Sequence, residues 1–128
     1  MTVGEGTDPL SEMEFSSALC GSLNCDTYKM ELYKWAHDPG EEDPFEELTR
    51  EDLEVIAYGH PKLIMRSWRN PRVECTFTAP NATHFTVQDV IETIEISERV
   101  FRNGDTHHVF FEGIMYFGNG RFETMWGS

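Results

Sequence analysis

The pattern of apolar and polar residues predicts a helical first half and a second half of strands around one helix. In the first half, apolar residues recur every three or four positions, the spacing of a helix with one buried face. Ser11 with Glu14, and Thr49 with Asp52, have the spacing of a capping box, in which each side chain accepts a hydrogen bond from the other residue's backbone N–H. We therefore expect three N-terminal helices, over residues 11–21, 26–37 and 49–58.

The second half begins with a predicted β-hairpin. Residues 62–68 and 72–78 are rich in strand-forming residues and flank the turn Arg69-Asn70-Pro71. Apolar and polar residues alternate along 72–78, as they do in a strand with one buried face. Cys75 falls on the apolar side and is expected in the core.

A helix between two hairpins has the clearest end signals in the chain. Thr86 and Asp89 have capping-box spacing, and Gly104 is a suitable stop. Many of its residues are β-branched, which lowers helix propensity, so tertiary packing has to stabilise it. Its apolar stripe consists of Val87, Val90, Ile91, Ile94 and Phe101.

The C-terminus predicts a second hairpin, because Asn119-Gly120 suits a type I′ turn with two positive φ angles. This turn sets the strand register. The expected pairs are Phe117 with Phe122, Met115 with Thr124, and Gly113 with Trp126. One face then carries Val109, Phe111, Met115, Phe117, Phe122 and Trp126. The other face carries His108, Phe110, Glu112, Ile114, Tyr116 and Glu123.

Together these elements predict an α+β fold. We expect one small domain with N-terminal helices and a mostly antiparallel sheet of about four strands, built as β-hairpin, helix, β-hairpin. Residues 1–10 are expected to be a flexible N-terminus, 38–47 an acidic linker, and 58–128 the sheet-and-helix core. The strand order stays open, because the helix can connect the hairpins in several ways.

The distribution of charge changes this picture most. The net charge is −13, and residues 1–57 hold 15 Asp and Glu against 3 Lys and Arg, whereas residues 58–128 hold 8 against 7. An acidic field repels nucleic acid and anionic membranes and attracts basic proteins. High charge also keeps an aromatic-rich chain in solution, so a purely solubilising role is the alternative.

The sequence contains few signatures of chemistry. Phosphate-binding loops, dinucleotide fingerprints and nucleophile elbows are missing. Cys20 and Cys25 lack the second tight pair of a zinc site, and with Cys75 they make an odd number that does not suggest a disulfide framework. We therefore expect no cofactor, no metal and no catalytic residue. A basic, apolar leader and an apolar run of about 20 residues are also missing, which predicts a cytoplasmic location without a membrane.

One polar set is a candidate site. His107, His108, Glu112 and Glu123 all fall on or near the predicted last hairpin, where convergence in a cavity would allow acid–base work. His108 and Glu112 share a strand face but lie roughly 13 Å apart, too far to hold one metal without a neighbouring strand. Nucleic-acid binding by the basic residues 62–72 is not expected, because carboxylates in the acidic half can pair with them.

Three functions remain open from the sequence. The first is a non-enzymatic acidic interaction protein that binds a basic protein partner through its N-terminal half. Its expected binding residues are Glu41, Glu42, Asp43, Phe45, Glu46 and Glu47. The second is a small-ligand-binding protein or small enzyme with a pocket between sheet and helices. The third is a self-associating structural protein that uses Phe110, Ile114 and Tyr116.

Overall fold

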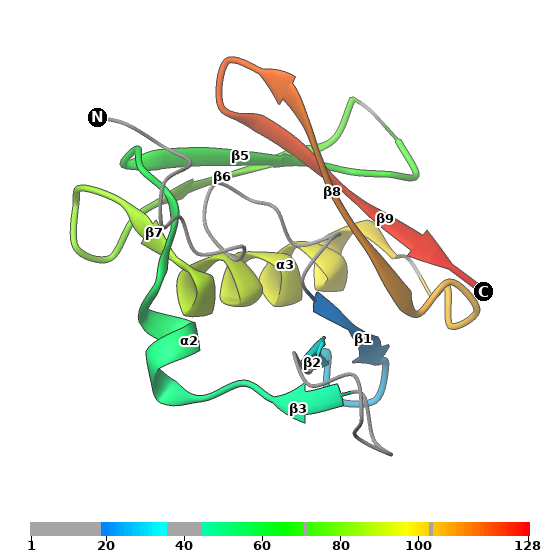
Figure 1. Ribbon diagram of the computed structural model, residues 1–128. Coiled ribbons are helices and arrows are strands. Elements are labelled where there is room, and N and C mark those ends of the chain that lie inside the picture. Colours follow the sequence, from blue (N-terminus) through cyan, green and yellow to red (C-terminus); the bar gives the residue numbers. More distant parts are fainter. Residues whose placement is uncertain (1–18, 36–44, 71, 103) are drawn as a thin grey trace.

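The computed structural model of the protein describes residues 19–35, 45–70, 72–102 and 104–128 (Figure 1). Within these ranges the chain is mainly sheet. The elements in chain order are β1 (Leu19–Asn24), β2 (Lys29–Trp35), β3 (Phe45–Glu47), α2 (Arg50–Glu54), β4 (Ile56–Tyr58), β5 (Lys62–Arg66), β6 (Glu74–Thr78), β7 (Phe85–Thr86), α3 (Val87–Phe101), β8 (Phe110–Gly118) and β9 (Arg121–Gly127).

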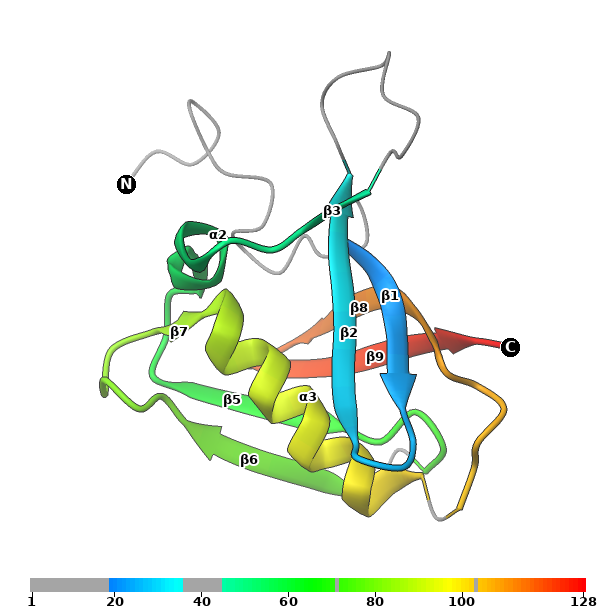
Figure 2. The same cartoon turned by 90° about the horizontal axis from the view of Figure 1, so that it is seen from below.

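Seven strands form one mixed sheet in the order β3-β2-β1-β8-β9-β5-β6. Neighbouring strands are antiparallel, except that β5 and β9 run parallel. The sheet twists strongly, so that β1 and β2 stand at a steep angle to β5 and β6 (Figure 2). Strands β4 and β7 form a separate pair at the start of α3.

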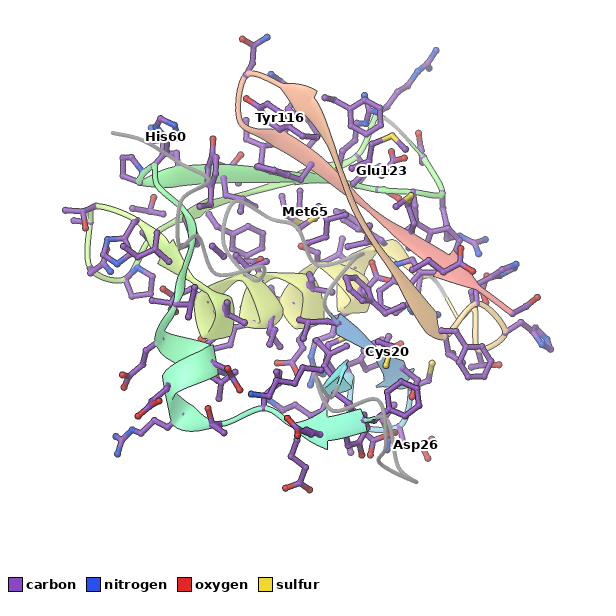
Figure 3. The ribbon with its side chains drawn as sticks, in the orientation of Figure 1. Cys20, Asp26, His60, Met65, Tyr116 and Glu123 are labelled. Atoms are coloured by element: carbon purple, nitrogen blue, oxygen red, sulfur yellow. The ribbon has the colours of Figure 1, made fainter. Side chains whose placement is uncertain are left out.

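Helix α3 lies against one face of the sheet, which we call the inner face, and the core fills the space between them (Figure 2). Met65 points from β5 toward this helix and is fully buried (Figure 3). The strands contribute the buried residues Leu19, Leu23, Leu32, Leu63, Met65, Phe111, Ile114 and Phe122. The helix contributes Val87, Val90, Ile91, Ile94 and Phe101, the stripe expected from its sequence.

The second predicted helix is wrong, because residues 29–35 form β2. Strands β1 and β2 make an antiparallel hairpin, paired from Leu19 opposite Lys34 to Asn24 opposite Lys29. In so short a stretch, Leu32 fits a helical stripe with Tyr28 and also a strand face with Met30. Long-range pairing decides between the two periods. Residues 11–18 of the first predicted helix lie outside the described residues, and residues 19–21 belong to β1.

The third predicted helix is confirmed at its start and wrong at its end. Thr49 accepts a hydrogen bond from Asp52 N at 3.1 Å, and Asp52 Oδ2 accepts one from Thr49 N at 2.8 Å, which is the expected capping box. Helix α2 then ends at Glu54, and residues 56–58 form β4. Within the expected linker 38–47, residues 45–47 form β3, and the rest lies outside the described residues.

The predicted α+β class with N-terminal helices and four antiparallel strands is therefore wrong. The described chain instead has a seven-stranded mixed sheet with two helices, α2 and α3. The error lies in the first half, because the hairpin β5–β6, the helix α3 and the hairpin β8–β9 are all found where the sequence predicts them. The helix α3 begins with the expected capping box between Thr86 and Asp89.

The register of the last hairpin differs from the prediction. The turn is confirmed, with φ of 56° at Asn119 and 74° at Gly120. A bulge at each end of the hairpin then shifts the pairing. The observed pairs include Gly118 with Arg121, Tyr116 with Phe122, Ile114 with Thr124, and Phe111 with Trp126.

Because of these bulges, some side chains of β8 lie on the face opposite to the predicted one. Ile114, expected on the outside, is 8% exposed, whereas Met115 and Phe117, expected inside, are 46% and 43% exposed. A shift of one residue moves side chains to the opposite face of a strand. The outer face of β8 therefore carries Met115 and Phe117 in place of Ile114.

Candidate functional site

A groove crosses the edge of the sheet at β2. Strand β3 pairs only with residues 33–35 of β2, so among the described residues no strand covers the first half of β2 on that side. The groove has a volume of about 360 Å³ and lies between this edge, α2 and α3. Its lining residues are Met30, Glu31, Leu32, Tyr33, Glu47, Leu48, Leu53, Gln88, Ile91 and Glu95, and we call it the β2 groove.

The β2 groove has an apolar floor and an acidic rim. Leu32 and Ile91 are buried, while Glu31 and Glu47 are exposed. Glu95 lies at the wall of α3, where its Oε2 accepts a hydrogen bond from Met30 N at 2.7 Å. This carboxylate takes the place that a carbonyl of a further strand would have. On this edge of β2, which no described strand pairs with over its first half, the Met30 N–H is therefore satisfied by a side chain.

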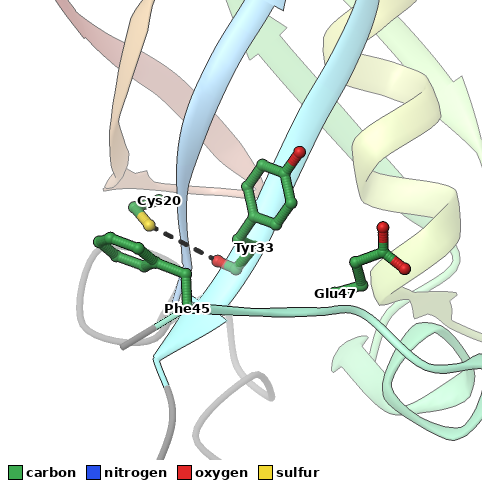
Figure 4. A pocket seen from close by; sticks show the side chains of 4 residues that line it. All are labelled: Cys20, Tyr33, Phe45 and Glu47. Carbon is green, nitrogen blue, oxygen red and sulfur yellow. Dashed lines mark hydrogen bonds between the residues drawn. The ribbon is translucent and has the colours of Figure 1, made fainter. Parts of the chain in front are cut away.

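A second hollow lies on the outer face next to the β2 groove (Figure 4). It has a volume of about 470 Å³ and is lined by Cys20, Tyr33, Phe45 and Glu47. Tyr33 and Phe45 are 41% and 38% exposed, so two aromatic rings border it. Burial raises the pKa of the Cys20 thiol, and this thiol donates to Tyr33 O at 3.8 Å. A raised thiol pKa disfavours the nucleophilic thiolate, so the hollow suits binding better than covalent chemistry.

Exposed carboxylates lie on the elements that border the β2 groove. The exposed acids on β2, β3, α2 and α3 are Glu31, Glu46, Glu47, Glu51, Glu54 and Glu92. Lys34 Nζ lies 2.7 Å from Asp52 Oδ2. Burial alone would raise the pKa of Asp52, but the bonds from Lys34 and Thr49 lower it below its ordinary value. Arg50 pairs loosely with Glu54 at 3.6 Å, and both side chains are mostly exposed. The field around the groove is therefore anionic.

The predicted binding set falls partly on these hollows. Glu47 lines both hollows, and Phe45 lines the outer one. Glu46, between these two residues in β3, is exposed and lines neither hollow. The remaining members, Glu41, Glu42 and Asp43, lie outside the described residues.

The predicted polar site is divided in the structure: the two histidines contact Asp105, and the two glutamates lie on strands β8 and β9. His108 Nδ1 lies 2.9 Å from Asp105 Oδ2, and His107 N donates to Asp105 Oδ1 at 2.8 Å. Glu123 pairs with Arg66 at 3.2 Å, and Glu112 is exposed at a bulge of β8. Within the described ranges, no group of three or more His, Cys, Asp or Glu could hold a metal ion.

Asp105, which the sequence did not single out, organises the loop before β8. Hydrogen bonds from His107 N and from His108 hold the pKa of its carboxyl well below the usual range. Arg69 Nη1 also lies 2.8 Å from Asp105 Oδ2. A carboxylate that accepts hydrogen bonds from nearby backbone N–H groups stabilises a local turn. The Asp105 cluster therefore stabilises the conformation of this loop.

A buried charge pair lies beneath that loop. Glu98 and Arg102 are both fully buried, and Arg102 Nε lies 2.8 Å from Glu98 Oε1. Trp68 Nε1 donates to the same carboxylate at 3.0 Å, and the Arg102 guanidinium lies over the Trp126 ring at 4.6 Å. Arg102 also donates to Asp105 O and His108 O. In the sequence this pair looks like an ordinary i, i+4 pair on a helix surface, and no local signal separates it from one.

No protein-family model, curated protein or solved structure matches this chain. In the described parts of the chain, neither helix has the length and apolar character needed to cross a membrane.

Proposed function

We propose that this protein is a non-enzymatic binding protein that holds an extended basic segment of a partner protein in the β2 groove. The segment would run along the uncovered edge of β2. Its apolar side chains would contact the floor and its lysine or arginine side chains the acidic rim. The observation that carries the proposal is a single groove that combines a strand edge, an apolar floor and carboxylates.

The strand edge supports an extended ligand. Added strands form hydrogen bonds with an exposed sheet edge, and alternate side chains enter neighbouring pockets. Among the described residues, no strand pairs with the first half of β2, so its edge is left for a ligand, next to Leu32 and Ile91. Tyr33 stands between the β2 groove and the outer hollow and contacts both, so it could serve as an aromatic anchor.

The charge supports a basic ligand. Glu31 and Glu47 are exposed at the rim, and the chain carries a net charge of −13. Such a field speeds the encounter with a cationic segment and repels an anionic one. This part of the proposal also predicts that binding weakens as salt screens the field.

The test uses a fluorescent peptide of alternating lysine and valine residues, titrated with the full chain and followed by anisotropy. We expect saturable binding that weakens as salt rises, and no binding of the matched glutamate–valine peptide. Binding that is equal for both peptides, or that is insensitive to salt, would contradict the proposal.

Three charge reversals locate the site. Glu31→Lys and Glu47→Lys should each weaken binding about three- to tenfold, since each replaces an attraction at the rim by a repulsion. Glu112→Lys changes the net charge equally at an exposed position that lines neither hollow. If Glu112→Lys weakens binding as much as the rim variants do, only the long-range field matters and the groove is not the site.

A further inference from the structure

The outer face of β5, β6, β8 and β9 has no described helix against it, because α3 lies on the inner face (Figures 1 and 2). Burial alternates along β5 and β6, with Leu63 and Met65 inside, whereas the bulges interrupt the alternation along β8. We call the outward side the open face. Its exposed apolar residues are Phe110, Met115 and Phe117, at 56%, 46% and 43%, and its half-buried ones are Ile64 and Met125.

Charge on the open face is balanced, unlike the charge of the whole chain. Its described cations are Lys62, Arg66 and Arg121, and its described carboxylates are Glu74, Glu112 and Glu123. Two ion pairs join members of these sets: Arg66 Nε to Glu123 Oε1 at 3.2 Å, and Arg121 Nε to Glu74 Oε2 at 2.9 Å. The net charge of this patch is therefore close to zero on a molecule of net charge −13.

The apolar and ionic parts of the open face are in contact. The Arg66 guanidinium lies 4.0 Å from the centre of the Phe117 ring, and Met115 pairs with Glu123 across the hairpin. Aromatic residues, Met and Arg, which meet here, are residue types enriched in protein interfaces.

We propose that the open face is a dimer interface at which it meets the same face of a second copy of this chain. Two copies repel each other through their acidic surfaces, and the balanced charge of the open face adds little to that repulsion. A two-fold axis sets each surface against itself, so a face without net charge meets its own copy without net repulsion. The acidic β2 groove lies elsewhere and stays available in such a dimer.

The first test is the mass of the full chain in solution, measured by light scattering and sedimentation over a range of concentrations. We expect twice the chain mass of 14.8 kDa at high concentration. Added salt should strengthen the dimer, because it screens the repulsion between two anionic chains. A wild-type chain that stays monomeric overturns the proposal without any variant. A dimer that salt dissociates overturns it too, because charge attraction between unlike surfaces would then hold the copies together.

Variants then locate the interface. Met115→Glu should weaken the dimer about tenfold or more, because it places a carboxylate in the apolar centre on both sides of the axis. Ile96→Glu is the matched control, since Ile96 is 52% exposed on α3 and lies off the open face. A dimer that Ile96→Glu dissociates and Met115→Glu leaves intact would place the interface on α3 and overturn the proposal. Thermal unfolding of the Met115→Glu and Ile96→Glu chains checks that each variant is folded.

Discussion

Arg102 and Glu98 form an ion pair that has no contact with solvent, one turn apart at the end of α3. Both side chains are 0% exposed, and Arg102 Nε lies 2.8 Å from Glu98 Oε1, although its N–H is not directed at that oxygen as in a hydrogen bond. The guanidinium instead directs N–H groups to Asp105 O and His108 O in the loop before β8. The pair therefore joins the helix to this loop, and through Trp68 and Trp126 to the sheet.

Removing Arg102 should destabilise the protein strongly. Arg102→Met keeps most of the side-chain volume but removes the cation from the buried Glu98 carboxylate, which keeps the Trp68 N–H as a donor. It also removes the donors to Asp105 O and His108 O. Loss of one member of a buried pair typically costs about 3–5 kcal/mol. We expect a fall of this size in the free energy of unfolding, measured by urea denaturation. The double variant Glu98→Gln/Arg102→Met should recover part of the loss, because it also removes the unpaired charge. Equal stability of the single and double variants would contradict this account.

Glu98 should give the stability a pH dependence of its own. Burial raises the pKa of this carboxyl above its ordinary value of 4.5, and the Trp68 and Arg102 interactions only partly oppose that rise. With the folded-state pKa above the unfolded one, the folded protein binds the proton more tightly. The stabilisation of the folded state by this proton is complete below pH 4.5, the pKa of the unfolded chain. It is lost as the pH rises through the pKa of the folded state.

The measurement is the free energy of unfolding of the wild type minus that of Glu98→Gln at several pH values. This difference should grow in favour of the wild type as pH falls from neutral toward 4.5. Glu92→Gln, the same substitution at an exposed position of the same helix, is the matched control. A difference that is constant with pH would show that Glu98 does not titrate in this way.

The cap of α3 should contribute measurably to stability. Thr86 Oγ1 accepts a hydrogen bond from Asp89 N at 3.1 Å, and Thr86→Ala removes it. We expect a loss of about 1 kcal/mol in the free energy of unfolding. Thr49→Ala removes the equivalent bond of α2, a five-residue helix without buried residues, and should cost less. An equal or larger loss for Thr49→Ala would mean that α2 is more important to the fold than its burial indicates.

Gly21 should not tolerate a side chain. It lies in β1 opposite Leu32 with φ of 153°, and a Cβ atom there would be 2.0 Å from Glu31 O. Because the obstacle is backbone, Gly21→Ala should cost roughly 1–3 kcal/mol or more. Gly59→Ala is the matched control, since nothing lies within 4 Å of a Cβ at that position. Thermal unfolding compares the two, and similar melting temperatures would show that β1 and β2 can separate freely.

Local signals predicted the second half of the fold well. The capping box at Thr86, the apolar stripe of α3 and the Asn119-Gly120 turn each act within a few residues, so the sequence contains all of their cause. The same holds for the start of α2 at Thr49. Of the candidate site, the sequence found Phe45 and Glu47 through an aromatic residue in an acidic stretch, and both line hollows.

Tertiary pairing decided the rest. Residues 29–35 fit either a helix or a strand, and six residue pairs with β1 made them a strand. Gly21 looks like a helix stop in the sequence, but the structure needs it where two strands come too close for a side chain. Glu98 and Arg102 look like surface charges, and only the packing of Trp68 and Trp126 around them buries the pair. Caps and tight turns depend on consecutive residues, so the sequence predicts them. Burial and strand pairing depend on residues far apart in the chain, and burial and strand pairing form the β2 groove and the open face.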